Sequence, residues 1–288
     1  MDCKLRKKLF LLLTAVFLIA GSLFISRLLD AHSAAASNSQ AQFIADIPPQ
    51  SVPAAQSPPP SASEPVPEVT EQAQQEDLPD FHVLSLKKLD LTALQETNPD
   101  VIGWILLPDT QINYPLLHTT DNSTYLSTAW DGTSNAAGSI FLETRSDPRL
   151  SDFNTIIYGH HMRNGSMFAA LMDYKEDAFL TDHKDIYIAT ASGIHRYTVF
   201  AAYEAPVTSH TYRLYFKNAM QKQAALDFYL GSSNWKPPLT PTVNNRILTL
   251  STCTGNGRYE TRWVVQAVQT GFWANEKAGS PEETSLIN

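Results

Sequence analysis

Side chains able to act as a nucleophile and its partner stand at the ends of two apolar, strand-like runs. Cys253 ends the run RILTLSTC, while His160 and His161 follow a glycine at the end of NTIIYGHH. A cysteine reacts as its thiolate, and a nearby base or cation lowers the pKa of the thiol. Either histidine has the chemistry of that base. Arg262, which opens the next strand, can hold a substrate carbonyl or stabilise an oxyanion. The pattern predicts a cysteine-based nucleophilic site.

Each of these residues also has an ordinary structural explanation. A lone cysteine on a strand is commonly a small buried hydrophobe, and a lone histidine or arginine is commonly a solvated group. Cys3 is the only other cysteine in the sequence, so we expect no cysteine-based zinc site. The combination of the three residue types favours catalysis, and we expect it to need neither a metal nor a cofactor.

Short apolar runs between residues 81 and 274 predict the elements that position these side chains. The strand-like runs are VIGWILL, INYPLL, GSIFLET, NTIIYGHH, DIYIATASGIHRYTVFAAY (two strands joined at Ser192-Gly193), RILTLSTC and TRWVVQAVQ. Helices are expected after the N-cap residue Asp90 and around SMFAALMDY. A four-residue repeat predicts a further helix, with its buried face formed by Phe216, Met220, Ala224 and Phe228. Many short strands with few helices predict a mostly β domain, a barrel or a sandwich.

The first 30 residues have the pattern of a cytoplasmic stub and a transmembrane anchor. Four basic residues precede an uncharged, mostly apolar run over residues 9–26. At about 1.5 Å per residue, this run nearly spans a bilayer core of roughly 30 Å. Basic flanks stay cytoplasmic, so we expect a single-pass membrane protein whose main domain is extracellular. A cleaved signal peptide, with residues 34–36 as the cleavage region, is the alternative, although its apolar segment is usually shorter.

A proline-rich, acidic segment separates this anchor from the domain. Residues 31–80 hold nine of the 18 prolines and seven acidic residues but no basic one, which predicts a disordered spacer. Residues 275–288 are expected to be a flexible tail. The formal net charge of -8 leaves no basic face of the kind that nucleic acid requires.

Three motifs together resemble the sortase family: TLSTC, the arginine that opens RWVV, and the upstream YGHHM. Four further stretches resemble the class B sortases in order and spacing: NPDVIGWILLPDTQINYPLL, DNSTYL, GSIF and NTIIYGHHMRNGSMF. The resemblance covers about residues 84–272. It implies an eight-stranded β-barrel catalytic domain. It also implies Cys253 as the nucleophile, His160 rather than His161 as general acid and base, and Arg262 as the third residue of the site.

The resemblance further implies a reaction and its partners. A sortase cleaves the sorting signal of an exported protein after threonine and forms a thioester. It then transfers the protein to an amine of a cell-wall precursor or a pilin. For class B the signal is Asn-Pro-x-Thr or a related Pro-x-Thr sequence. The covalent intermediate divides one difficult amide exchange into two steps. The expected setting is the surface of a Gram-positive bacterium.

In class B relatives, the sorting peptide lies in a groove whose lining corresponds here to Asn122, Leu126, Tyr158 and Ser251. Leu126 is expected to form an apolar wall, and Asn122 and Ser251 to hydrogen-bond the peptide. Tyr212, in the loop region before the long helix, is expected to join them. Ordinary packing is the alternative role for Leu126 and Tyr158.

Other classes of protein agree less well with the sequence. Papain-like proteases place the cysteine before the histidine within a C-G-S-C-[WY] pattern, whereas His160 precedes Cys253 here. An L,D-transpeptidase-like cell-wall enzyme would also use cysteine and histidine, but its Ser-x-Gly-Cys run is absent. A non-catalytic, membrane-tethered surface binding domain is a further alternative. The presence of His160, Cys253 and Arg262 together favours the enzyme.

Overall fold

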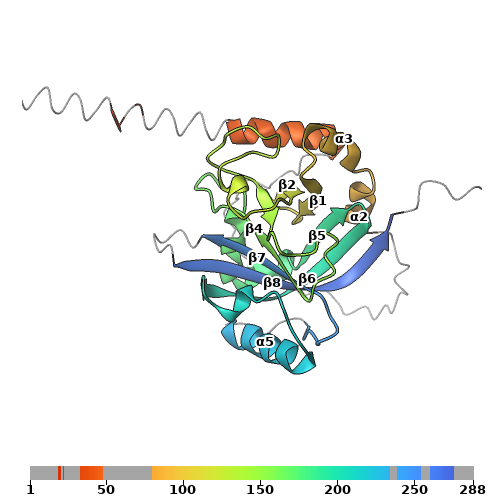
Figure 1. The fold of residues 1–288 in the computed structure, drawn as a ribbon, viewed down its shortest axis with the longest axis vertical. Coiled ribbons are helices and arrows are strands. Elements are labelled where there is room, and N and C mark those ends of the chain that lie inside the picture. The colour runs from red at the N-terminus through yellow and green to blue at the C-terminus, as the bar shows by residue number, and fades with distance from the viewer. Residues whose placement is uncertain are drawn as a thin grey trace, which may run out of the picture.

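The computed structural model describes residues 19–20, 22, 33–47, 80–233, 239–253 and 260–275. Within them, eight strands close into a barrel in the order β1-β2-β3-β4-β7-β8-β6-β5 (Figure 1). The strands are β1 (Val101–Leu106), β2 (Asn113–Leu117), β3 (Ile140–Leu142), β4 (Asn154–Tyr158), β5 (Asp185–Thr190), β6 (Gly193–Pro206), β7 (Ile247–Cys253) and β8 (Thr261–Ala274). The predicted mostly β, eight-stranded barrel is confirmed.

One parallel strand pair positions the site. β4 runs parallel to β7, with Tyr158 opposite Ser251, and β2 runs parallel to β3. All other neighbouring strands are antiparallel. Parallel neighbours require a long crossover connection, which here passes through β5, β6 and the helix α5 (Ala219–Ser232). Segments that are far apart in the sequence therefore end side by side.

Alternate residues of every strand form the core inside the barrel. Fully buried members of this cluster include Ile105, Ile157, Ile188, Leu250 and Val265. Successive side chains of a strand point to opposite faces, so one residue in two faces this interior. Burying such a side chain contributes about 1.5–3 kcal/mol relative to leaving it exposed. The interior of the barrel is filled by apolar side chains, so the candidate catalytic residues lie at the strand ends.

Short helices cover parts of the outer barrel surface. Besides α5 and a helix at residues 33–44, the longer described α-helices are α2 (Phe81–Leu86), α3 (Leu91–Thr97) and α4 (Asp177–Asp182). The described 3-10 helices are η1 (Thr124–Leu126), η2 (Ala169–Lys175) and η3 (His210–Tyr212). The predicted cap of α3 is confirmed, because the Asp90 carboxylate accepts the Ala93 N–H at 2.9 Å. The helix expected around SMFAALMDY is the 3-10 helix η2 rather than an α-helix.

The long helix α5 buries a different face from the predicted one. The buried residues are Ala225, Leu226 and Tyr229. Met220 is 76% exposed and Phe228 is 39% exposed, and Ala224 is also exposed. Only Phe216, before the helix, is partly buried against this cluster. The predicted face is wrong because steps of four residues drift by about 40° each around a helix of 3.6 residues per turn. Mixed steps of three and four stay on one face.

The beginning of the predicted spacer is folded onto the barrel, so its boundary at residue 31 is wrong. Residues 33–44 are helical and lie along the barrel as the orange helix of Figure 1. Ala41 and Ala45 are fully buried, and the Ser37 carbonyl accepts the Trp130 indole N–H at 2.8 Å. Alanine-rich composition suggested a spacer, but alanine also has the highest helix propensity and allows close packing. Residues 48–79 lie outside the described part of the chain.

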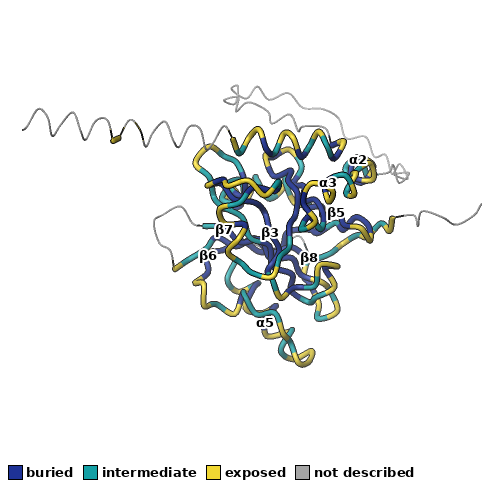
Figure 2. The backbone as a smooth tube through the Cα atoms, turned by 45° about the horizontal axis from the view of Figure 1, so that its top comes forward, coloured by how far each residue is buried: buried dark blue, intermediate teal, exposed yellow. Residues whose placement is uncertain are grey.

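Other predictions for the two ends of the chain concern residues that the structure hardly describes. Of the expected anchor, only residues 19, 20 and 22 are described, and they are helical. Of the expected tail, only Asn275 is described. Within the described residues, no helix combines the length and the apolar character needed to cross a bilayer. Figure 2 shows the buried strands enclosed by more exposed helices and loops.

Candidate active site

The parallel ladder of β4 and β7 brings His160 to Cys253. Tyr158 lies opposite Ser251, and one residue later the Gly159 N–H donates to the Ser251 carbonyl at 3.2 Å. His160 then reaches the end of β7, where its side chain interacts with that of Cys253. Main-chain hydrogen bonds between β4 and β7 thus bring His160 and Cys253, which are far apart in the sequence, next to each other.

The glycine before His160 is required by close packing. A Cβ atom at Gly159 would lie 2.4 Å from the Ile140 side chain and 2.7 Å from the Phe168 ring. The Phe168 N–H also donates to the His160 carbonyl at 2.8 Å. The backbone that carries His160 is therefore held by close packing at Gly159 and by a hydrogen bond at its own carbonyl.

The antiparallel pair of β7 and β8 places Arg262 directly opposite Cys253. This confirms the expectation that the strand after the Cys253 loop returns the arginine to the cysteine. One Arg262 Nη atom donates to the Thr261 carbonyl at 3.0 Å. The site therefore combines a thiol, an imidazole and a permanent cation.

The electrostatics of the site favour a charged thiolate–imidazolium pair. The hydrogen bond with His160 lowers the pKa of Cys253; burial opposes this effect, and the charge of Arg262 supports it. The hydrogen bond with Cys253 raises the pKa of His160, although burial and Arg262 oppose it. The Leu126 carbonyl also raises the pKa of His160, because it accepts a hydrogen bond from Nε2 at 2.8 Å. The thiolate is the reactive form of cysteine.

The other histidine candidate, His161, is positioned differently. Its backbone pairs with Met167, and its side chain lines a neighbouring cavity together with Arg163 and Asp173. No described contact joins its ring to Cys253. The structure thus places His160, rather than His161, against the cysteine.

Three of the residues predicted to bind a sorting peptide, Leu126, Tyr212 and Ser251, lie close to His160 or Cys253. The Tyr212 hydroxyl and Ser251 Oγ are 2.9 Å apart, and Ser251 lies two residues before Cys253 on β7. Leu126 is 45% exposed, so its side chain is accessible while its carbonyl holds His160. Whether these residues contact a peptide stays a prediction.

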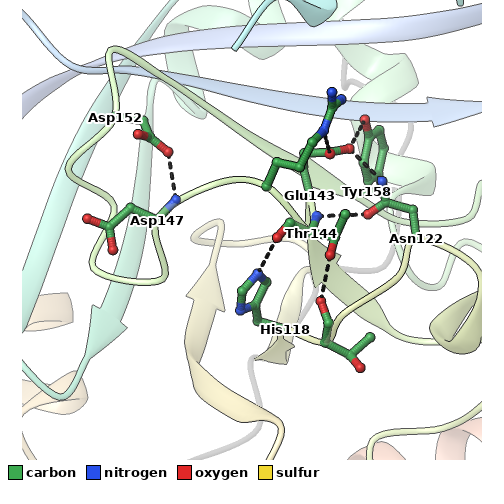
Figure 3. Close-up of polar contacts among 9 residues, drawn as sticks. His118, Asn122, Glu143, Thr144, Asp147, Asp152 and Tyr158 are labelled. Atoms are coloured by element: carbon green, nitrogen blue, oxygen red, sulfur yellow. Dashed lines mark hydrogen bonds and ion pairs between the residues drawn. The ribbon is translucent and has the colours of Figure 1, made fainter. Parts of the chain in front are cut away.

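Asn122 and Tyr158 meet at Glu143, a residue that the sequence did not single out. Figure 3 shows Asn122 Nδ2 and the Tyr158 hydroxyl directed at one carboxylate oxygen, Oε2, at 2.6 and 3.1 Å. Arg145 Nε donates to the other oxygen at 2.9 Å. Glu143 itself is 2% exposed. Burial, aided by the charge of Glu143, raises the pKa of Tyr158. The only signal in the sequence is an acidic residue directly after an apolar run, which usually denotes a solvated group.

Known proteins resemble this chain across the barrel and the site. A family model described as a sortase domain matches residues 105–270. Sortase B of Staphylococcus aureus is 35% identical over 161 residues, which are 56% of this chain and 66% of that protein, just under two thirds of its length. Sortase B of Listeria monocytogenes is 38% identical over 184 residues, covering 62% of this chain and 72% of that protein.

The resemblance extends to the fold. The structure of a Staphylococcus aureus sortase B–substrate complex matches with a TM-score of 0.60 and 34% identity, over 62% of this chain and 84% of that one. The span matched by the family model is more than half of this chain and includes His160, Cys253 and Arg262. The chain therefore belongs to the sortase family, and within it to the class B sortases.

Proposed function

We propose that this protein is a cysteine transpeptidase that cleaves a Pro-x-Thr type sorting signal after threonine and transfers the acyl part to an amine. The observation that carries the proposal is the convergence of three side chains at the end of β7, where Arg262 lies directly opposite Cys253 and His160 follows the strand paired with β7. The interaction between His160 and Cys253 lowers the pKa of the thiol. Membership of the sortase family supports it, as does the fact that the similar Staphylococcus aureus sortase B forms a substrate complex.

In the first step, the Cys253 thiolate attacks the carbonyl carbon of the threonine. The negative charge that develops on the carbonyl oxygen is stabilised by the Arg262 guanidinium. The imidazolium of His160 then gives its proton to the leaving amine as the C–N bond breaks. The product is a thioester between Cys253 and the threonine, with His160 left neutral.

In the second step, an acceptor amine attacks the thioester carbonyl. His160 takes a proton from this amine, a new amide forms and the Cys253 thiolate leaves. The acceptor in this proposal is an amine of a cell-wall precursor or of a pilin. The donors are exported proteins with a C-terminal sorting signal.

The proposed location of this reaction is the outer surface of the cell membrane. The argument comes from the sequence: basic residues precede the apolar run at residues 9–26, so the N-terminus is cytoplasmic and the barrel extracellular. A protein held there meets exported substrates and wall precursors.

The test is the intact mass of the full-length protein after incubation with a panel of Pro-x-Thr peptides. The full chain is used because residues 33–47 pack on the barrel. It carries Cys3→Ala, so that Cys253 is its only thiol. We expect a mass gain equal to the peptide up to threonine, and no gain when Cys253 is also replaced by Ala.

The outcomes separate the competing functions. An adduct with one peptide identifies the sorting motif. A folded protein that forms no adduct with any peptide contradicts the proposal and favours a surface binding domain. An adduct that persists in the Cys253→Ala variant excludes Cys253 as the nucleophile.

A further inference from the structure

A hydrogen-bonded cluster, here called the Glu143 node, connects two segments that both determine the position of His160. Its members are Glu143, Asn122, Tyr158 and Arg145. Asn122 belongs to the turn over residues 121–126, which ends at the Leu126 carbonyl that binds His160. Tyr158 belongs to β4, two residues before His160. Both donate to the same oxygen of Glu143. One buried carboxylate oxygen thus holds the turn against the strand.

The Asn122 amide is bound at both of its ends. Its Nδ2 donates to Glu143, and its Oδ1 accepts the Thr144 N–H at 2.9 Å. Two of its hydrogen-bonding groups are therefore used within the protein, which leaves few for a peptide. Asn122 is therefore better suited to fixing the position of the turn than to hydrogen-bonding a substrate peptide.

Hydrogen bonds hold the turn at its start and at its end. Oδ1 of Asp121 accepts the N–H groups of Ser123 and Thr124 at 2.6 and 2.7 Å. At the end of the turn, the Ser139 N–H donates to the Tyr125 carbonyl at 2.9 Å. Asn122 and Leu126 therefore belong to one hydrogen-bonded turn, and we expect a displacement of Asn122 to move the Leu126 carbonyl.

We propose that Glu143 is a positioning residue that sets the Leu126 carbonyl against His160 and thereby keeps the imidazole directed at Cys253. It touches neither reacting group and acts through Asn122 and Tyr158. The inference rests on the proposed function insofar as it takes His160 and Cys253 as the reacting pair.

The carboxylate acts through its shape more than through its charge. The charged and titratable groups that act on His160 are Cys253 on β7 and Arg262 on β8, and Glu143 is not among them. Those that act on Cys253 are His160 and Arg262. Tyr212, from η3, also faces Cys253 and Arg262. A neutral residue that offers one oxygen to both Asn122 and Tyr158 should therefore replace Glu143.

The experiment measures the pH midpoint of Cys253 alkylation by iodoacetamide in the full-length Cys3→Ala protein. In Glu143→Ala the turn is released and the Leu126 bond to His160 weakens. His160 then holds its proton less firmly and stabilises the thiolate less. The midpoint should move by about 0.5–1 pH unit towards the ordinary thiol value.

Two variants make the control set. Glu143→Gln keeps an oxygen for Asn122 and Tyr158, and its midpoint should stay within about 0.2 pH unit of the parent. Arg145→Ala removes only an ion pair whose arginine is 61% exposed, and it should leave the midpoint unchanged.

Two results would overturn the proposal. One is a folded Glu143→Ala protein with the parent midpoint. The other is a shift in Glu143→Gln as large as in Glu143→Ala, because the charge would then be the cause. If Glu143→Ala does not fold, Asn122→Ala takes its place with the same expected shift, and an unchanged midpoint contradicts the proposal. Alkylation needs no sorting peptide, so a protein that shows the shift but forms no acyl-enzyme would refute the proposed function alone.

Discussion

Two polar networks support different parts of the site, and they differ in charge and in exposure. The Glu143 node holds the turn that orients His160, and its Arg145 side chain is largely in solvent. The second network, here called the buried ring, is a closed circuit of neutral hydrogen-bonding groups. Its members are Asn154, Tyr203, Thr211, Thr249 and Gln266, all at most 6% exposed.

The buried ring supports the turn that carries Tyr212. The Asn154 amide donates to the carbonyls of Thr211 and Arg213, each at 3.0 Å, and accepts the Thr249 hydroxyl at 2.7 Å. Gln266 donates to Thr249 at 3.1 Å and accepts the Tyr203 hydroxyl at 3.0 Å. Tyr203 and Thr211 close the circuit with a hydroxyl–hydroxyl bond of 2.9 Å.

The difference in charge between the two networks suggests that one mainly stabilises the fold and the other mainly supports the reactive pair. Deep burial favours neutral groups that satisfy one another, because an uncompensated charge there is costly. A carboxylate is tolerated at the node because three donors bind it, one of them from an exposed arginine. We expect damage to the ring to reduce mainly the free energy of unfolding. Loss of the bonds that Glu143 makes with Asn122 and Tyr158 should change mainly the properties of the His160–Cys253 pair.

The largest effect is expected from Asn154→Leu, which keeps the volume but removes the hydrogen bonds. The carbonyls of Thr211 and Arg213 would be left unpaired, at about 1–3 kcal/mol for each buried group. Urea unfolding should show a loss of about 3 kcal/mol, with no change in the alkylation midpoint of the molecules that remain folded.

Thr155→Val is the matched control on the same strand. The Thr155 hydroxyl is buried and has no hydrogen-bond partner within the described residues, so its removal should be neutral or stabilising. Equal losses of stability in Thr155→Val and Asn154→Leu would show that the strand, and not the ring, is sensitive to substitution.

A smaller loss of stability is expected from Tyr158→Phe, which removes one donor from the node. Its unfolding free energy should fall by about 1 kcal/mol, and the Cys253 midpoint should rise by less than in Glu143→Ala, because Asn122 still holds Glu143. Urea titration and iodoacetamide kinetics on one preparation measure both. A stability loss matching that of Asn154→Leu would remove the distinction between the networks.

The smallest effect is expected at the hydroxyl contact between Tyr212 and Ser251, which links the turn held by the buried ring to the strand that carries Cys253. A double-mutant cycle of Tyr212→Phe and Ser251→Ala should give a coupling of about 0.5–1 kcal/mol in urea unfolding, because the two hydroxyls are 2.9 Å apart. No shift of the alkylation midpoint is expected. A midpoint shift equal to that of the node variants would show that both networks act on the thiol.

The sequence predicts those features that depend on neighbouring residues or on a motif. The strands, the Asp90 cap and the return of Arg262 to Cys253 follow from local patterns. Glu143 and Gln266 could not be found in this way, because most of their partners come from other segments and their neighbours in the sequence resemble those of solvated residues. The buried face of α5 depends on how the helix docks, and the helix at residues 33–44 depends on a barrel surface that composition does not reveal.

His160 and Cys253 meet only across the β4–β7 ladder, and β5, β6 and α5 lie between those strands along the chain. Contacts that close so long a loop carry an entropic cost and form slowly. β7 and β8 are also synthesised after all the other strands. An incomplete or unfolded chain therefore carries a cysteine with no imidazole or guanidinium held beside it. The lowered pKa of the thiol is therefore a property of the closed barrel, and the growing chain carries a cysteine of ordinary reactivity until β7 and β8 are in place.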